Sequence, residues 1–180
     1  RKIDEVNGLS PLFLPTGFCE SVLQVKGEAL AAAGIGLLLA DLDNTLAPYG
    51  QPVAAQEVRD WKNSLETSGV TLFVLSNNRH QDRPRIFSED LGVPYIGHAG
   101  KPSPKALYEA MARQGVTAAQ TALVGDQIFT DVLCGNRGGV ATILVEPIRL
   151  AGNPGRYLRY AAELPFRALA KRRKGGIRWG

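Results

Sequence analysis

Five short apolar runs constrain the fold of this chain more than any other feature. They are rich in Leu, Val and Ile, and they are continuous rather than alternating, which is typical of parallel strands buried on both faces. The expected strands are 35–41, 71–76, 94–97, 121–125 and 140–145, and the expected helices between them are 53–67, 82–91, 103–114 and 127–135. This alternation predicts a doubly wound, Rossmann-like α/β domain, in which helices cover both faces of a central, mainly parallel five-stranded sheet.

The segments outside these units are expected to add to a single domain. A chain of 180 residues suits one compact core. Before the first strand, a helical stretch from Glu20 to Ala33 is expected to pack against the sheet. We therefore expect one α/β domain over 1–150, followed by a basic C-terminal tail over 151–180 that is helical or partly disordered.

Charge is distributed unevenly along the chain. Residues 149–180 carry nine of the 21 basic side chains but one of the 17 acidic ones, which gives +8 there and −4 over residues 1–148. Such a tail could touch an anionic membrane, stay solvated, or meet nucleic acid. We favour the first two over specific nucleic-acid binding, and an oligomer stays open.

Several function classes are disfavoured by composition. The most apolar stretch, Ala29–Ala40, is interrupted by glycines and is too short to span a bilayer. The N-terminus, Arg1 to Glu5, lacks the apolar core of a secretory signal. Cys19 and Cys134 stand alone, which argues against a zinc site and for reduced thiols. We expect a cytoplasmic protein, with contact to the inner membrane as a peripheral option.

Polar side chains follow the expected strands at their carboxyl ends, where α/β folds place their ligands. They are Asp41 and Asp43 after the first strand, Ser76 and Asn77 after the second, Lys101 after the third, and Asp126 and Asp131 after the fourth. Each alone is typical of a turn or a helix cap. Four such groups in this order favour one shared site for phosphoryl transfer.

The two carboxylates at Asp41 and Asp43 are two residues apart, so on an extended strand they face the same side. One could attack phosphorus while the other protonates the leaving oxygen and later deprotonates water. An anionic nucleophile facing an anionic substrate needs a cation, and Mg²⁺ prefers oxygen ligands. We expect Asp41, Asp126 and the backbone carbonyl of Asp43 to bind it, with Asp131 supporting these ligands from behind.

Phosphate binding is expected from groups that follow the second and third strands. The Ser76 hydroxyl lies before a helix N-terminus, and the Lys101 ammonium can reach back towards the nucleophile. Lys105 remains a rival to Lys101. A second group, Arg79, Arg83 and Arg85, could help to bind a phosphorylated substrate, although a solvated helix start is an equal alternative. His80 and His98 lack ligand spacing and receive no function.

The chain resembles the haloacid dehalogenase (HAD) superfamily of Mg²⁺-dependent phosphatases. The resemblance rests on Asp41-Leu42-Asp43-Asn44-Thr45, Ser76, Lys101-Pro102 and Gly125 to Asp131. The wider runs at 75–78, 101–105 and 124–132 look like the YqeG-type subgroup, which includes phosphatidylglycerophosphate phosphatases of mitochondria and plastids. The resemblance extends from about Leu12 to Ile148.

That resemblance implies a role for each matched residue. Asp41 is expected to be the nucleophile, Asp43 the acid and base, and Asp126 a metal ligand. Ser76 and Lys101 are expected to bind phosphate, and Thr45 and Asn77 are assigned to the same task.

The spacing between strands leaves no room for a cap domain. About thirty residues separate the first two strands and about twenty the next two, which are the lengths of a loop plus a helix. An uncapped site stays open to large substrates, so a lipid headgroup would fit. Two alternatives remain: a soluble sugar or nucleotide phosphatase, and a platform without catalysis that uses the tail to bind membrane or RNA.

Overall fold

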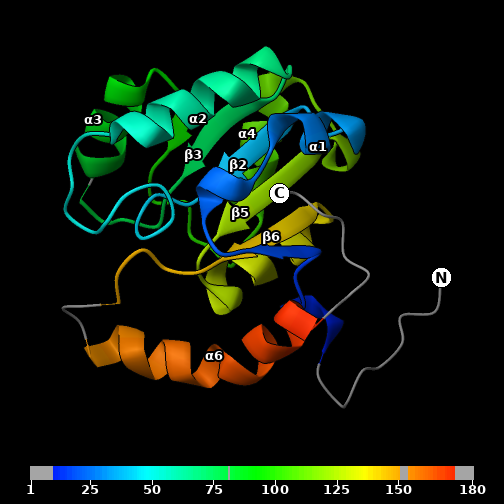
Figure 1. The fold of residues 1–180 in the computed structure, drawn as a ribbon, viewed down its shortest axis with the longest axis vertical. Helices are drawn as coiled ribbons and strands as arrows, with labels where there is room; N and C mark the ends of the chain where they lie inside the picture. The colour runs from blue at the N-terminus through cyan, green and yellow to red at the C-terminus, as the bar shows by residue number, and fades with distance from the viewer. Residues whose placement is uncertain (1–9, 81, 151–153, 173–180) are drawn as a thin grey trace.

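The computed structural model describes residues 10–80, 82–150 and 154–172. Its sheet has six parallel strands in the order β1-β6-β5-β2-β3-β4 (Figure 1). The strands are β1 (Gly17–Cys19), β2 (Leu37–Ala40), β3 (Thr71–Leu75), β4 (Tyr95–Ile96), β5 (Thr121–Gly125) and β6 (Ala141–Val145). The predicted doubly wound α/β class is therefore confirmed, with one strand more than the five expected.

Helices connect the strands and cover the sheet. They are α1 (Gly27–Ala32), α2 (Gln56–Thr67), α3 (Asp82–Leu91), α4 (Lys105–Gln114), α5 (Leu133–Gly138) and α6 (Pro154–Arg172), with short 3₁₀ turns at η1 (Pro11–Phe13), η2 (Val22–Gln24) and η3 (Ala118–Gln120). The helix expected over 127–135 starts as a π-helical turn, η4 (Ile128–Val132), and continues as α5. Between β2 and β4 the described residues form α2, β3, α3 and the loops that join them, so no cap domain is inserted among them.

The single helix expected from Glu20 to Ala33 is wrong. The turn η2 ends at Gln24, the next residue, Val25, is extended, and α1 begins only after Lys26. The indole Nε1 of Trp61 donates to the Val25 carbonyl over 2.8 Å, so a tertiary contact on α2 holds this backbone out of a helix. Residues 17–19, which were not assigned to any strand, pair with β6 as the sixth strand, β1.

The sheet separates two apolar layers. Leu38 and Ala40 of β2 face the cluster that includes α1, α2 and α3, whereas Leu37 and Leu39 face the cluster that includes α4 and α5. All four are fully buried. Side chains alternate across a strand, so burial on both faces explains why the run is continuously apolar.

Cys19 and Cys134 are both buried, and neither forms a disulfide.

Helix α6 packs beside the edge of the sheet that β1 and β6 form (Figure 1). Phe166 of α6 lies in an aromatic cluster with Phe13 and Phe129, in which neighbouring ring centroids are 5.3–6.0 Å apart. Ala170 joins the apolar cluster beneath it. The described part of the tail is therefore helical and docked, while the division of the chain at residue 150 stays a prediction. Arg173, Lys174 and Arg178 lie outside the described residues.

A buried ion pair attaches α6 to the loop after β5. Glu163 and Arg167 are both nearly inaccessible, and their side chains meet over 3.0 Å. Glu163 also accepts a hydrogen bond from the Phe129 amide over 3.0 Å, and Arg167 donates to the Asp126 carbonyl. Each end of the pair thus binds the backbone of residues 126–129.

No helix among the described residues has the length and apolar content needed to cross a bilayer.

We predict that removing one member of this pair destabilises the protein more than removing both. Glu163→Leu removes the closer carboxylate of the buried Arg167 guanidinium and leaves only Glu146, 3.5 Å away. This loss should cost about 3–5 kcal/mol of unfolding free energy. The double variant Glu163→Leu/Arg167→Met removes both charges and should lose less. Urea unfolding measures this, with the exposed Glu89→Leu as control; a double variant that is less stable than Glu163→Leu would contradict it.

Candidate active site

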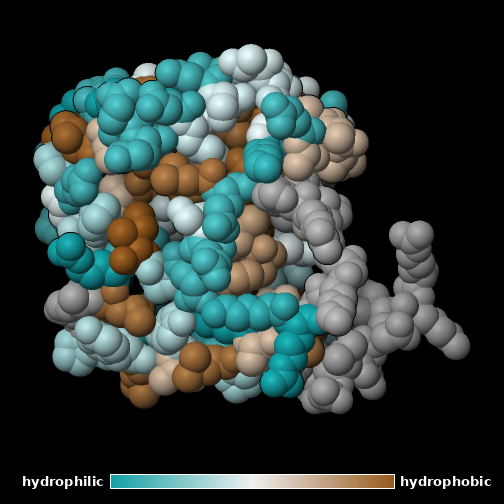
Figure 2. Space-filling view, in the orientation of Figure 1, coloured by the Kyte–Doolittle hydropathy of each residue, from teal (hydrophilic) through white to brown (hydrophobic). Residues whose placement is uncertain are grey.

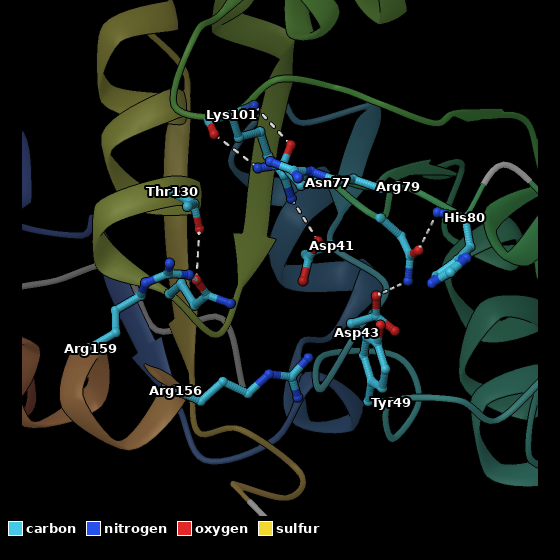
Figure 3. A pocket seen from close by; sticks show the side chains of 12 residues that line it. Asp41, Asp43, Tyr49, Asn77, Arg79, His80, Lys101, Thr130, Arg156 and Arg159 are labelled. Atoms are coloured by element: carbon cyan, nitrogen blue, oxygen red, sulfur yellow. Dashed lines mark hydrogen bonds and ion pairs between the residues drawn. The ribbon is translucent and has the colours of Figure 1, made fainter. Parts of the chain in front are cut away.

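A cavity of about 510 Å³ opens at the carboxyl ends of the sheet strands (Figure 3). Asp41 and Asp43 after β2, Asn77 after β3 and Lys101 after β4 all contribute to its lining. The expected convergence of strand ends is therefore observed. The remaining lining comes mainly from the segment after β3, from the loop after β5 and from the first turns of α6.

Lys101 is the central cation of the site. Its Nζ lies 2.7 Å from Asp41 Oδ1 and 2.7 Å from Asp131 Oδ1, and its side chain is 1% exposed. The Asn77 side chain clamps the Lys101 backbone, accepting from its amide and donating to its carbonyl, each over 2.8 Å. Lys105, the rival in the sequence, is exposed at the start of α4. The structure thus brings Lys101, and not Lys105, to Asp41.

Three buried carboxylates form a cluster around this ammonium. Asp41, Asp126 and Asp131 each offer an oxygen within 4.8 Å of the others. The η4 turn bends the chain so that Asp131 Oδ2 accepts from the Gln127 amide over 3.1 Å. A Cβ at Gly125 would collide with the Asp131 carboxyl group, so glycine at this position allows the close approach. Asp131 therefore stands behind the cluster, bonded to Lys101 and to the turn.

The electrostatics of the cluster leave it short of positive charge. Burial raises the pKa of Asp41 to about 7 and raises the pKa of Asp126 well above its usual value, and the neighbouring carboxylates add to both effects. Burial alone would lower the pKa of Lys101, but Asp131 and Asp41 raise it above its ordinary value. One ammonium faces three buried carboxylates, so a further cation would lower the energy of the ionised site.

The donor set fits a hard divalent cation. Mg²⁺ and similar ions take carboxylate and carbonyl oxygens, and the cluster presents such oxygens on facing loops. One of them, Asp126 Oδ1, is buried and lacks a hydrogen-bond partner among the described residues. Asp41 and Asp126 could hold the cation, together with the backbone carbonyl of Asp43.

Asp43 is held from the opposite side of the cavity. Its carboxylate accepts from Asn78 Nδ2 over 2.7 Å and from Arg83 Nε over 2.8 Å. Arg83 also donates to the carbonyls of Pro48 and Gln51, which fixes the loop after β2. The sequence did not identify Asn78 or Arg83 as a partner of Asp43. Arg83 was considered only as one of three arginines near a helix start.

The other expected residues have different environments. Ser76 is buried, and its hydroxyl accepts from the Asn78 amide over 3.1 Å. The Thr45 hydroxyl is buried and lacks a partner among the described residues. Arg79 and His80 line the cavity, whereas Arg85 is half-buried and pairs with acidic residues of its own helix α3. Thus phosphate binding by Thr45, Ser76 and Asn77 stays a prediction.

Three further lining residues had no assigned role in the sequence. Arg156 and Arg159 project from α6 into the cavity, and Tyr49 lies on the loop after β2 (Figure 3). The Arg156 guanidinium lies 4.6 Å from the centroid of the Tyr49 ring. The basic composition of the tail was the only available signal, and it did not indicate which arginines reach the site.

Comparisons with known proteins identify the family of this chain. A family model described as "HAD-hyrolase-like" matches residues 98–147. The probable phosphatase YqeG of Bacillus subtilis (strain 168) is 36% identical over 172 residues, which is 95% of this chain and 98% of that protein. A chloroplastic phosphatidylglycerophosphate phosphatase 1 of Chlamydomonas reinhardtii is 32% identical, covering 82% of this chain and 58% of its own length.

A solved structure shares the fold at low sequence identity. An uncharacterized protein from Listeria monocytogenes serotype 4b aligns with a TM-score of 0.52 and 14% identity, over 74% of this chain and 99% of that one. The similarity to the Bacillus protein runs almost end to end along both chains. The chain therefore belongs to the YqeG-type phosphatases of the HAD superfamily.

Proposed function

We propose that this phosphatase is an Mg²⁺-dependent phosphomonoester hydrolase that works through an aspartyl-phosphate at Asp41, and that its substrate is a glycerophospholipid phosphate such as phosphatidylglycerophosphate. The observation that carries the chemistry is the contact of Lys101 with Asp41 on the floor of an open cavity. It gives the nucleophile a fixed position and a neighbouring cation.

The reaction divides between the two carboxylates after β2. Asp41 attacks phosphorus, forming a new P–O bond as the P–O bond to the leaving alcohol breaks. Asp43, held by Asn78 and Arg83, gives the alcohol oxygen a proton. Asp43 then takes a proton from water, which attacks the aspartyl-phosphate and releases inorganic phosphate and free Asp41. Lys101 compensates negative charge beside the nucleophile throughout.

Mg²⁺ would be held by Asp41, Asp126 and the Asp43 carbonyl, with Asp131 orienting Lys101. When bound, it supplies charge neutralisation for the phosphoryl oxygens. The protein contributes the buried carboxylates and the backbone contacts that keep them close together.

The surface around the cavity supports a lipid substrate. The described chain has no cap over the site, so a bulky substrate can enter. The outer face of α6 exposes Tyr157, Leu158 and Leu164, with 51%, 76% and 49% of each residue accessible, and Figure 2 shows apolar side chains along this helix. Apolar side chains beside arginines suit the interface of an anionic bilayer. We propose that the protein acts in the cytoplasm and binds the anionic bilayer peripherally through the outer face of α6.

The nucleophile assignment predicts that Asp41→Asn loses at least about 1,000-fold in turnover, because an amide cannot form the aspartyl-phosphate. Hydrolysis of para-nitrophenyl phosphate with Mg²⁺ measures the loss. The exposed Asp60→Asn on α2 is the matched control and should keep wild-type activity. Circular dichroism checks that both variants are folded; a folded Asp41→Asn enzyme with normal turnover would exclude Asp41 as the nucleophile.

Metal binding is predicted to weaken with falling pH. Because the pKa of Asp41 is about 7 without metal, its carboxylate is largely protonated below that pH and must lose the proton before it can act as a ligand. The apparent Mg²⁺ affinity should fall about tenfold per pH unit below 7 if one proton is released. Calorimetric titrations at pH 6, 7 and 8 test this, and a constant affinity would rule out the linkage.

The lipid assignment predicts a preference that depends on the outer face of α6. Phosphatidylglycerophosphate in anionic vesicles should be hydrolysed faster than sugar or nucleotide monophosphates. Leu158→Ser should lower vesicle binding and lipid turnover several-fold without changing turnover of a soluble ester, and Leu23→Ser, an exposed change outside α6, serves as control. Faster turnover of the soluble metabolites would favour a metabolite phosphatase instead; no turnover of any ester would favour a platform without catalysis.

A further inference from the structure

The cavity carries positive charge that the reaction at Asp41 does not use. Arg79, Arg156 and Arg159 line it, and among the described residues none of the three forms an ion pair with a carboxylate. Elsewhere in the described chain, ion pairs form at Arg59, Arg83, Arg85, Arg113 and Arg167, but not at Arg137, Arg149 or Arg172. What distinguishes the cavity wall is that three arginines without a carboxylate partner gather in one place.

Two of these arginines are positioned by contacts that leave their charge uncompensated. Arg159 Nη1 donates to Gln127 Oε1 over 2.7 Å, and Gln127 directly follows Asp126. Arg156 stacks over the Tyr49 ring. An amide oxygen and an aromatic face orient a guanidinium, but neither carries the formal negative charge that would neutralise it.

The reacting end of the site does not need these arginines. The Lys101 ammonium already lies beside Asp41, and the carboxylate cluster would hold the metal. Both α6 arginines instead reach the cavity from the side of α6, where Arg156 extends towards Tyr49 (Figure 3). At about 510 Å³ the cavity is in the size range of sites for whole small ligands. It therefore has room for more than the phosphate under attack.

We propose that Arg156 and Arg159 bind a second phosphate group of the substrate, separate from the phosphomonoester that Asp41 attacks. Guanidinium groups pair with phosphate oxygens through two parallel hydrogen bonds, which lysine cannot reproduce. The inference rests on the proposed function and specifies its substrate class: a molecule with a phosphomonoester at one end and a phosphodiester close to it. α6 then selects the substrate in place of a cap.

The test uses two soluble esters that share the reacting group. Glycerol 3-phosphate carries one phosphate, and glycerophosphoglycerol phosphate, the lipid from which both acyl chains have been removed, adds a phosphodiester. Wild-type enzyme should prefer the second by at least tenfold in kcat/KM, mainly through KM. Arg156→Ala/Arg159→Ala should remove most of that preference, and Arg156→Lys/Arg159→Lys should restore only part of it.

The matched control removes two exposed arginines elsewhere. Arg172 lies sixteen residues beyond Arg156 on α6, about 24 Å along the helix, and Arg113 lies on α4 and pairs with Glu109. Arg113→Ala/Arg172→Ala should keep the wild-type preference. Equal losses on both esters, or an effect of Arg156→Ala/Arg159→Ala confined to vesicle-bound lipid, would overturn the proposal and assign these arginines to general electrostatics or to the bilayer.

A binding experiment separates this inference from the proposed function. Calorimetry with Asp41→Asn and Mg²⁺ compares the affinities of the two esters without turnover. A preference of at least tenfold for the doubly phosphorylated ester, lost in Asp41→Asn/Arg156→Ala/Arg159→Ala, supports the second phosphate site even if wild-type enzyme hydrolyses neither compound. Equal affinity for the two esters overturns it even if both are hydrolysed.

Discussion

The structure depends on one buried ammonium held between two carboxylates. Lys101 pairs with Asp41 and Asp131, and each of the three side chains is at most 10% exposed. Burying a carboxylate without a partner is costly, so this lysine is what allows the acidic loops after β2 and β5 to approach each other. A third carboxylate at Asp126 exceeds what one ammonium can balance. The cluster is thus stable as a scaffold yet still attracts a cation.

The topology explains how Lys101 reaches its partners. The strand before it, β4, lies at the edge of the sheet, while β2 and β5 are adjacent near the centre. The loop after β4 must therefore return across the end of β3. Asn77, which follows β3, binds the Lys101 backbone through both ends of its side-chain amide. A residue expected to touch phosphate is, in this structure, a support for the lysine.

The fold was predictable where local pattern and tertiary burial agree. The run Leu37–Ala40 is apolar at every position because both faces are covered, and it was assigned as a strand. The errors occur where a tertiary contact decides. Gly17–Cys19 has only three residues and becomes a strand by pairing with β6. Val25 follows a helix-like pattern, yet the Trp61 hydrogen bond holds it extended.

The site was predictable as far as the strand ends define it. Asp41, Asp43 and Lys101 converge because parallel strands end at one edge of a sheet. The pairing of Arg83 with Asp43 was not predictable, since it joins residues forty positions apart through a helix start that looks solvated. The place of Arg156 and Arg159 in the cavity could not be predicted for a similar reason. The sequence shows that the tail is basic, but it does not show how α6 docks on the domain.

The inner face of α6 serves two purposes with one helical repeat. Arg156, Arg159, Glu163 and Arg167 follow one another at intervals of three or four residues, so they lie on the same side of the helix. The first two face the cavity and the last two hold the loop of Asp126. One residue inserted between the pairs would turn the arginines by about 100° relative to the anchor. Substitutions at Arg156 and Arg159 can therefore change which ligand the cavity binds. The number of residues between this pair and the anchor pair cannot change without turning the two pairs apart.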